Sequence, residues 1–360
     1  MRRRSAKAGR QTLHPAIEHL APRPEVTVVP FGMTRATSRA LTAVLPDGLQ
    51  GRTTRVPARA LFGAWAHVAW PRAELWTGKV DVVHGMNFVV PPARAPTIVT
   101  VHDLTFLHSR ELCRGEVAHY ETLLRVAIRR DATILVGSDF VGREVRDAFG
   151  LPPERVRRVY FGIAPTAGGD RPRRRRLAGG DRYVLALGTI EPRKNLPTLV
   201  RAFDRLAARD PAVVLALGGP DGWGLTEFEA AVAGATHWDR VHRLGYVDNR
   251  QRLDLLAGAR VLAFPSLYEG FGHPPLEAMG AGTPVVASDA GSLPEALGDA
   301  ALLVDPRDDE ALAGALGRVL DDDDLRRDLV ARGLERVTRY PWDACCDAMI
   351  ELYRSVAGLT

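Results

Sequence analysis

The 360-residue sequence has few cysteines and no long apolar segment. Its three cysteines are Cys113, Cys345 and Cys346, and the last two are adjacent, so we expect neither a disulfide framework nor a zinc ligand set. No apolar run reaches the roughly 18 residues of a membrane span, and the basic start is not followed by the apolar core of a signal peptide. We therefore expect a cytoplasmic protein.

Basic charge is scarce outside two short segments. Residues 1–10 and 171–176 each carry five basic groups and no acidic one, and removing these ten charges from the formal net charge of +5 leaves −5. A continuous basic surface for nucleic acid is therefore not expected. Only Lys7, Lys79 and Lys194 among the 48 basic residues are lysines, so a lysine within a motif is informative.

Several common catalytic motifs are also missing. No Asp-x-Asp follows an apolar strand, and no set of His, Asp and Glu has the spacing of a metal site, so a bound divalent ion is not indicated. The sequence contains neither a Walker-type phosphate loop nor a Ser-x-Gly elbow. These absences argue against the common kinases and hydrolases.

Short β-branched runs alternate with helical patterns, which is typical of βαβ units and a parallel α/β sheet. The length predicts about two domains. We expect strands at residues 25–31, 80–85, 97–103, 132–138 and 156–162, and then at 183–189, 212–219, 240–247, 260–266, 283–289 and 301–306.

The composition also predicts where the domains begin and end. Residues 1–165 form the first domain, and residues 166–181, rich in Pro, Gly and Arg, form a linker. Residues 182–340 form the second domain. Residues 341–360 have helical apolar spacing and are expected to form an amphipathic helix.

Two further segments have alternative interpretations. The apolar segment 60–70, flanked by three arginines, is compatible with a helix on the inner membrane face and with a half-buried core helix, and the second is more common. Peripheral membrane contact therefore remains an open alternative. The acidic run 321–324 is expected to cap the helix that follows it rather than to bind a metal.

The most informative segment is SLYEGFGHPPLEAMGAGTPVVAS, residues 266–288. Gly270 and Gly272 allow a close backbone approach to a ligand, and two prolines suit the first turn of a helix whose amino end attracts an anion. A carboxylate beside phosphate would repel it. Glu269 and Glu277 are therefore better placed to accept hydrogen bonds from hydroxyl groups, on a sugar and on a ribose.

This Glu, seven residues, Glu pattern resembles the signature of family 4 of the retaining glycosyltransferases. The resemblance implies a GT-B fold, with two facing Rossmann-like domains, parallel sheets and a cleft between them. Other matching segments are IEPRKNLPTLVRAF (190–203), GGPDGWG (218–224), LGYVDN (244–249), VVHGMNFVVPP (82–92) and TVHDLTFLH (100–108).

The resemblance and the positions at strand ends together assign roles to individual residues. Catalytic roles fall to His102, Arg193, Lys194 and Glu269, with the two cations facing a diphosphate. The expected acceptor-side residues are His84, Asn87 and Asp103. The expected donor-binding residues are Gly188, Thr189, Gly219, Val247, Gly270, Phe271, Gly272, His273, Pro275, Leu276 and Glu277.

The sequence thus predicts a metal-independent retaining hexosyltransferase that uses a nucleotide-diphosphate sugar and no further cofactor. GDP-mannose is slightly favoured as donor, and the acceptor is left open among a glycan, a lipid-linked molecule and a small molecule. An alternative is a catalytically silent GT-B protein that binds nucleotide sugar or a partner. A nucleotide-sugar epimerase is less well supported, because no acid and base pair is evident.

Two positions depart from the family pattern. His273 stands where a small apolar residue is common, which affects the expected sugar pocket. Family members usually open with a strand and a Gly-rich loop, whereas this chain begins with a segment that resembles only the helix after that loop. Gly9 and Arg10 are interpreted as a remnant of the loop, and we expect the reading frame to continue upstream of Met1.

Overall fold

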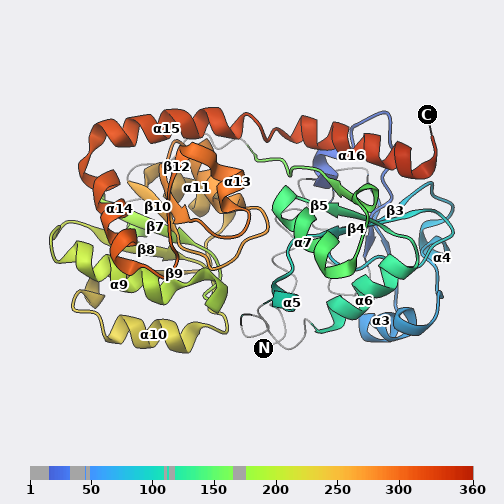
Figure 1. Ribbon diagram of the computed structural model, residues 1–360, viewed down its shortest axis with the longest axis horizontal. Coiled ribbons are helices and arrows are strands. Elements are labelled where there is room, and N and C mark those ends of the chain that lie inside the picture. The colour runs from blue at the N-terminus through green and yellow to red at the C-terminus, as the bar shows by residue number, and fades with distance from the viewer. Residues whose placement is uncertain are drawn as a thin grey trace. The chain divides into compact units, whose positions relative to one another are not determined.

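The computed structural model describes residues 16–32, 45, 49–108, 112, 118–164 and 176–359. The chain divides into two compact units (Figure 1). Unit 1 comprises Met1–Gly162 and Pro341–Thr360, and unit 2 comprises Ile163–Tyr340. The segment 341–360, treated above as separate, thus belongs to unit 1. Most of the expected linker lies outside the described residues, as do Gly9 and Arg10.

Unit 2 is built on a parallel six-stranded sheet in the order β12-β11-β10-β7-β8-β9. Its strands are β7 (Tyr183–Leu187), β8 (Val214–Gly218), β9 (Val241–Gly245), β10 (Val261–Phe264), β11 (Val285–Ser288) and β12 (Ala301–Val304). All of them fall within the runs predicted from the sequence. The chain leaves β7 toward β8 and β9 and then returns to the other side of β7 as β10, so the switch point of the sheet lies between β7 and β10.

Helices cover both faces of this sheet. They are η4 (Pro192–Lys194), α9 (Leu196–Ala207), α10 (Leu225–Ala233), η5 (Trp238–Arg240), α11 (Asn249–Gly258), α12 (His273–Gly280), α13 (Leu293–Leu297), η6 (Gly298–Ala300), α14 (Asp309–Asp321) and α15 (Asp323–Val337). Buried residues of α9, α10 and α14 share one core cluster with Val184 and Leu215. On the opposite face the Tyr183 hydroxyl donates to the Leu255 carbonyl of α11 at 2.6 Å. Burial from both sides explains the uninterrupted apolar sequences of β7 and β8.

Unit 1 contains a parallel four-stranded sheet in the order β3-β4-β5-β6. Its strands are β3 (Val83–Gly85), β4 (Thr97–Val101), β5 (Thr133–Val136) and β6 (Val156–Arg158). Its helices include α3 (Ala58–His67), α4 (Glu74–Thr77), α5 (Thr105–His108), α6 (Ala118–Arg129), α7 (Asp139–Phe149), η3 (Pro153–Arg155) and α16 (Trp342–Ala357). Leu61 and Trp65 of α3 are buried in the core of this unit, so the helical part of segment 60–70 is a half-buried core helix, whereas Val68 and Trp70 beyond its end are exposed.

The expectation of a full strand over residues 25–31 is wrong. Only Phe31–Gly32 is paired there, as β1, with β2 (Arg52–Thr53) in a separate two-stranded ribbon. Pro30 lies inside the expected strand and has no N–H group to donate to a ladder, although its carbonyl accepts from the Arg52 amide at 2.7 Å. An apolar alternating run is therefore not enough to form a strand at this position.

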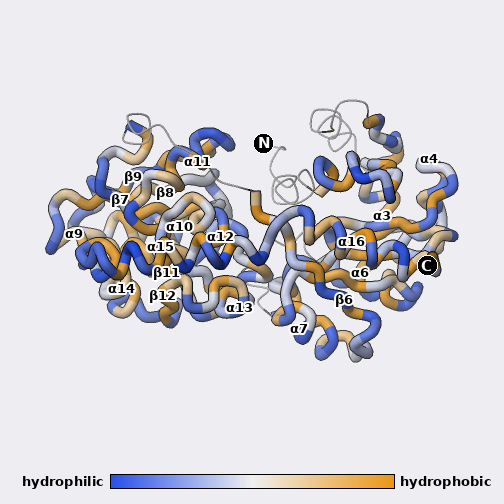
Figure 2. The backbone as a smooth tube through the Cα atoms, turned by 90° about the horizontal axis from the view of Figure 1, so that it is seen from above, coloured by the Kyte–Doolittle hydropathy of each residue, from blue (hydrophilic) through white to orange (hydrophobic). Residues whose placement is uncertain are grey.

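The predicted C-terminal helix is confirmed as α16, and Figure 2 shows hydrophobic and hydrophilic residues alternating along it. The helix buries Cys345, Cys346 and Met349. Its Trp342 ring stacks on the His19 ring of the same unit, with 5.0 Å between the ring centroids. These contacts explain why the last segment packs with unit 1.

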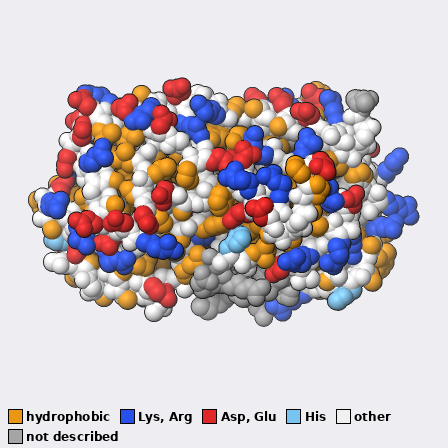
Figure 3. All heavy atoms as spheres, in the orientation of Figure 1, with side chains coloured by type: hydrophobic (Ala, Val, Ile, Leu, Met, Phe, Trp, Pro, Cys, Tyr) orange, Lys and Arg blue, Asp and Glu red, His pale blue; other side chains and the backbone are white. Residues whose placement is uncertain are grey.

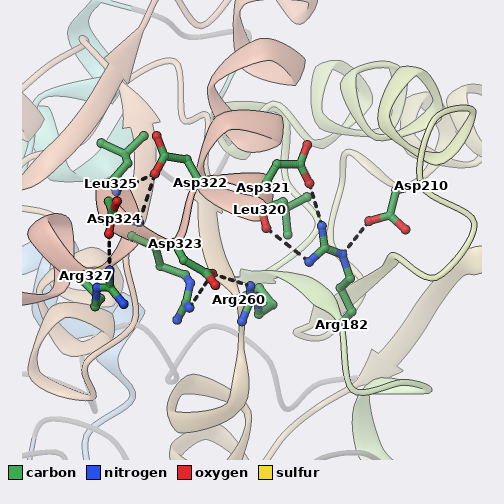
Figure 4. Close-up of polar contacts among 11 residues, drawn as sticks. Arg182, Asp210, Arg260, Leu320, Asp321, Asp322, Asp323, Asp324, Leu325 and Arg327 are labelled. Atoms are coloured by element: carbon green, nitrogen blue, oxygen red, sulfur yellow. Dashed lines mark hydrogen bonds and ion pairs between the residues drawn. The ribbon is translucent and has the colours of Figure 1, made fainter.

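The acidic run 321–324 caps a helix, as expected. The Asp322 carboxylate accepts from the amides of Asp324 and Leu325 at the start of α15 (Figure 4). Asp321, at the end of α14, pairs with Arg182, just before β7, at 2.8 Å. Part of the acidic run therefore also connects an early and a late segment of unit 2. On the face shown in Figure 3, acidic and basic side chains are interspersed. The helices of the described part of the chain include none with the length and apolarity needed to cross a bilayer.

Candidate active site

The charged residues expected at the site follow the two strands that flank the switch point of unit 2. Arg193 and Lys194 lie in η4 after β7, and Glu269 lies on the loop after β10. Because β7 and β10 are paired neighbours, their two loops start from the same carboxyl edge of the sheet. The topology therefore brings together side chains that are 75 positions apart in the sequence.

Glu269 is held by both cations. Lys194 Nζ lies 2.6 Å from Glu269 Oε1, and Arg193 Nη1 lies 2.8 Å from Glu269 Oε2. Only 10% of the Glu269 side chain is exposed. Burial alone would raise its pKa, but the charges of Arg193 and Lys194 lower it to about 2. Glu269 is therefore an ionised acceptor throughout the physiological pH range.

The backbone of Glu269 is fixed from the loop after β11. The amide and the hydroxyl of Ser292 donate to the Glu269 carbonyl at 2.9 and 3.0 Å. Gly291 has a φ of +64°, and a Cβ at this position would lie 2.5 Å from that carbonyl. Glycine is therefore required at position 291, because a side chain would push Glu269 out of its place.

The expected donor-binding residues Gly188, Thr189, Gly219 and Val247 lie on the loops after β7, β8 and β9. The loops approach backbone to backbone: the Gly188 amide donates to the Gly218 carbonyl at 2.9 Å, and a Cβ on Gly219 would lie 1.7 Å from the Gly188 carbonyl oxygen. Only glycine fits at position 219. The structure thus gathers these loops at the carboxyl edge of the sheet that also carries Lys194.

The amino end of α12 completes this edge of unit 2. Gly272 is its N-cap with a φ of +99°, and His273 is the first helical residue. The two prolines expected to favour an anion site also reduce it, because Pro274 and Pro275 have no N–H groups. Phosphate-binding amides at this helix end can come only from residues before Pro274.

The side chains near this helix start differ in their burial. Phe271 and Leu276 are buried in the core, and Pro275 is buried as well, so their side chains support the loop. The His273 ring packs edge-on against Phe271, with 5.0 Å between centroids. Contacts of Gly270 and Phe271 with a donor would therefore come from their backbone, whereas the Leu276 amide already donates to the Gly272 carbonyl at 3.3 Å.

Glu277, on the first turns of α12, forms an ion pair with Arg252 of α11. Both side chains are mostly buried. Burial raises the Glu277 pKa, and the Arg252 charge opposes that rise. Arg252 also donates to the Asn249 side chain at 2.9 Å, which fixes its guanidinium on the helix. Sequence reasoning missed Arg252, because nothing in a motif indicates a partner 25 positions away.

In unit 1, His102 directly follows β4. Its Nε2 lies 2.9 Å from the Met86 carbonyl oxygen, and because a carbonyl can only accept, this nitrogen carries the proton. Burial lowers the His102 pKa, with the Met86 carbonyl and Asp103 opposing the change. The neutral ring therefore has its lone pair on Nδ1, where it can accept a hydrogen bond.

His84, expected on the acceptor side, has both ring nitrogens bound within the unit. Nδ1 lies 2.9 Å from the Tyr353 hydroxyl of α16, and Nε2 lies 2.7 Å from Thr100 Oγ1. Burial and the neighbouring His102 lower the His84 pKa to about 3. These contacts give His84 a structural task, which is to hold α16 against β4.

The other two acceptor-side residues also show local roles. Asp103 accepts from the amide and the hydroxyl of Thr105 at 3.0 and 2.8 Å, at the start of α5. Asn87 is exposed in a tight turn after β3, where its carbonyl accepts from the Val89 amide at 2.7 Å. Of the four unit 1 candidates, His102, Asn87 and the second carboxylate oxygen of Asp103 thus retain groups that a substrate could engage.

The structure therefore brings Arg193, Lys194 and Glu269 into one cluster and pairs Glu277 with Arg252. A second residue missed by sequence reasoning is Glu191, which pairs with Arg193 at 2.8 Å. The signal was present in the IEPRKN segment, where an acid precedes two bases. Within the described residues, no group of three or more His, Cys, Asp and Glu side chains is placed to hold a metal ion.

Comparison with known families covers both units. Residues 170–336 match the family model of glycosyl transferases group 1, and residues 12–167 match that of glycosyltransferase family 4. The chain is 33% identical over 296 residues to the O-antigen chain mannosyltransferase B of Escherichia coli, covering 79% of this chain and 77% of that protein. It is 32% identical to the phosphatidyl-myo-inositol mannosyltransferase of Mycolicibacterium smegmatis, covering 87% and 83%.

Solved structures agree on the fold. The Anabaena protein HepE, solved with UDP and glucose, superposes with a TM-score of 0.74 at 17% identity, covering 96% of both chains. Sucrose-phosphate synthase from Thermosynechococcus elongatus gives a TM-score of 0.66 at 24% identity, covering 94% and 96%. The fold is that of the GT-B glycosyltransferases, and the chain belongs to the group 1 glycosyltransferases of family 4.

Proposed function

We propose that this protein is a metal-independent retaining glycosyltransferase that moves a hexose from a nucleotide-diphosphate sugar to an acceptor. The observation that carries the proposal is the Lys194–Glu269 ion pair at the switch point of unit 2. It places a cation for phosphate and a carboxylate for hydroxyl groups at one sheet edge. The names of the E. coli and M. smegmatis relatives favour mannose as the transferred hexose.

Lys194 and the amino end of α12 would stabilise the departing nucleoside diphosphate. Negative charge grows on this group as the glycosidic bond breaks, so a cation placed beside it contributes more in the transition state than in the ground state. A compact ammonium with three N–H donors can hold Glu269 and a phosphate oxygen together. We propose on this basis that no divalent ion is required.

The two carboxylates, Glu269 and Glu277, would accept hydrogen bonds from hydroxyl groups of the donor. Glu269, kept ionised by its two cations, would accept hydrogen bonds from the hexose hydroxyls, and Glu277 would accept from the ribose. The free lone pair of His102 Nδ1 suits a further sugar hydroxyl. Each group is an acceptor fixed before ligand arrives, which lowers the cost of ordering the site.

A panel of nucleotide sugars tests the proposal. Purified protein is incubated separately with GDP-mannose, UDP-glucose and other UDP- and GDP-hexoses, and the released nucleoside diphosphate is measured. We expect release from one donor or a narrow group, with GDP-mannose first. With water as the acceptor the second product is the free hexose, and NMR at early times, before mutarotation, reports its anomeric configuration; an inverted product would contradict a retaining reaction.

We also propose peripheral contact with an anionic membrane through the end of α3 and the start of α4. Val68, Trp70 and Leu75 are 51%, 65% and 62% exposed, and Arg59 and Arg72 lie on the same stretch of chain. An exposed Trp beside arginines suits a lipid headgroup region, where an apolar ring and a charge are both accommodated.

Vesicle sedimentation tests this contact. We expect the protein to sediment with phosphatidylglycerol vesicles and less with phosphatidylcholine vesicles, and Trp70→Ser to reduce sedimentation severalfold. Trp238→Ser is a matched control, because Trp238 is 60% exposed but belongs to unit 2. The proposed contact would be contradicted if the wild type and both variants sediment equally, or if none of the three proteins sediments with the vesicles.

A further inference from the structure

We infer that Arg193 and Glu191 form a positioning pair for Glu269, and that Lys194 is the one of the two adjacent cations that contacts the diphosphate. The inference rests on the proposed function. It gives different roles to Arg193 and Lys194, which the sequence analysis both assigned to binding the diphosphate.

Arg193 is committed to acceptors of the protein through both ends of its guanidinium. Nη2 lies 2.8 Å from Glu191 Oε1, while Nη1 lies 2.8 Å from Glu269 Oε2 and 3.1 Å from the Tyr268 carbonyl oxygen. The planar fork of arginine has a fixed set of donor directions, so donors aimed at two carboxylates are not available to a phosphate.

Moving Arg193 to a phosphate would also break two buried ion pairs. The Glu191 and Glu269 side chains are only 11% and 10% exposed. A carboxylate buried to this extent is strongly destabilised when it loses its cation. Arg193 is therefore expected to stay with its carboxylates when a diphosphate binds.

Two further hydrogen bonds join the loops that carry Arg193 and Glu269. The Leu267 amide donates to the Arg193 carbonyl at 2.8 Å, and the Asn195 side chain donates to the Pro265 carbonyl at 3.1 Å. These bonds join the loop after β7 to the loop after β10. Arg193, with Glu191 and the hydrogen bonds between the two loops, thus forms a clamp that fixes the orientation of the Glu269 carboxylate.

Lys194 has a different environment. Its ammonium donates to Glu269 Oε1 at 2.6 Å and lies 4.6 Å from the centroid of the Phe264 ring. An ammonium has three N–H donors that rotate about a flexible stem, so it can keep Glu269 and add a phosphate oxygen. Of the two cations, Lys194 is the one whose geometry permits an additional partner.

Charge balance gives a prediction that separates the two roles. Glu191 neutralises Arg193, so Glu191→Gln leaves the site with one more positive charge while weakening the clamp. If the pair only positions Glu269, this variant should bind nucleoside diphosphate at least as tightly as the wild type and yet transfer more slowly. A direct loss of a phosphate ligand would have the opposite effect on binding.

The test compares Arg193→Met, Arg193→Lys, Glu191→Gln and Lys194→Met. Calorimetry gives the Kd for GDP and UDP and for the corresponding monophosphates, and steady-state kinetics gives kcat and KM with GDP-mannose and UDP-glucose. We expect Lys194→Met to weaken diphosphate binding at least about tenfold relative to monophosphate binding. Arg193→Met and Glu191→Gln should leave the diphosphate Kd within about twofold while kcat falls about tenfold to a hundredfold. Arg193→Lys should recover only part of that loss, because an ammonium cannot bridge both carboxylates.

The inference is overturned if Arg193→Met weakens diphosphate binding as much as Lys194→Met while monophosphate binding is unchanged. Glu191→Gln, which preserves the size of the side chain, decides the matter if Arg193→Met does not fold: weaker diphosphate binding in this variant would contradict the clamp. A wild-type protein that binds neither GDP nor UDP would contradict the proposed function itself, and the inference with it.

Discussion

Lys194 Nζ lies 2.6 Å from Glu269 Oε1, although the two residues are separated by 75 positions and belong to loops after different strands. The pair exists because β7 and β10 are neighbours at the point where the strand order reverses. It holds a buried carboxylate in its charged form without any ligand. Electrostatic groups that are fixed in advance are the ones that contribute most to catalysis.

Lys194→Ala should lower transfer at least about a hundredfold, the scale observed when one preorganised electrostatic group is removed. The fold should persist, because Lys194 lies at the sheet edge and not in a core cluster. Lys79→Ala is the matched control, since Lys79 is an exposed lysine of unit 1. Wild-type rates for Lys194→Ala at saturating donor would remove the residue from the site.

Arg252→Gln should make nucleotide binding sensitive to acid. Burial already raises the Glu277 pKa, and loss of the Arg252 charge raises it further, so a larger fraction of Glu277 is protonated at pH 6 than at pH 8. We expect the Kd for GDP or UDP to rise at least about threefold over this interval in the variant. Arg250→Gln, an exposed change on the same helix, should behave as the wild type. A pH-independent Kd in Arg252→Gln would show that Glu277 does not need this partner.

His84 should make unit 1 less stable in acid. Its folded pKa is lowered to about 3 from an ordinary value near 6.5, so between these pH values the unfolded chain binds a proton that the folded protein does not. The stabilisation of the folded state by the neutral His84 ring is complete above pH 6.5 and is lost as the pH falls toward 3. It corresponds to about 2 kcal/mol of unfolding free energy between pH 7 and pH 5.

His84→Gln should therefore show a smaller loss of stability over the same interval. Urea denaturation of both proteins at pH 7 and pH 5 measures the difference. The exposed His67→Gln serves as the control, and we expect it to match the wild type. Identical pH dependence of His84→Gln and the wild type would contradict the burial of a neutral imidazole.

Transfer should survive chelation. In the proposed reaction the diphosphate is met by Lys194 and the amino end of α12, so excess EDTA should leave the rate within about twofold of the untreated enzyme. The assay is donor turnover with and without EDTA, followed by addition of magnesium or manganese. Loss of turnover that either ion restores would show that the leaving group depends on a metal.

The sequence predicted most strands because their apolar runs are buried on both faces and bounded by glycine or proline. The run YVLALGT became β7, and RVLAFPS became β10. The run at residues 25–31 failed, because Pro30 cannot donate to a ladder and the partner strand at Arg52–Thr53 is only two residues long. Strand propensity alone cannot reveal the absence of a pairing partner.

The places of the candidate residues in the fold were predictable where a polar side chain lies on the loop after a strand. His102 directly follows β4, and Lys194 and Glu269 lie on the loops after β7 and β10. Glu191 and Arg252 were missed because their significance depends on a tertiary partner. His84 was also expected to contact a ligand, but in the structure its ring contacts Tyr353 and Thr100. Whether a strand-end residue faces solvent or another element is decided by packing that the local sequence does not contain.

The most direct test of the central claim is the rate of nucleoside diphosphate release from the donor panel by the wild type and by Glu269→Gln, measured side by side. Glutamine keeps the size of the side chain but removes the charge that Lys194 and Arg193 hold in place. The account predicts release from at least one nucleotide sugar by the wild type and a rate at least about a hundredfold lower for the variant, with both proteins folded. Equal rates for the two proteins, or a wild type that consumes no donor, would contradict it.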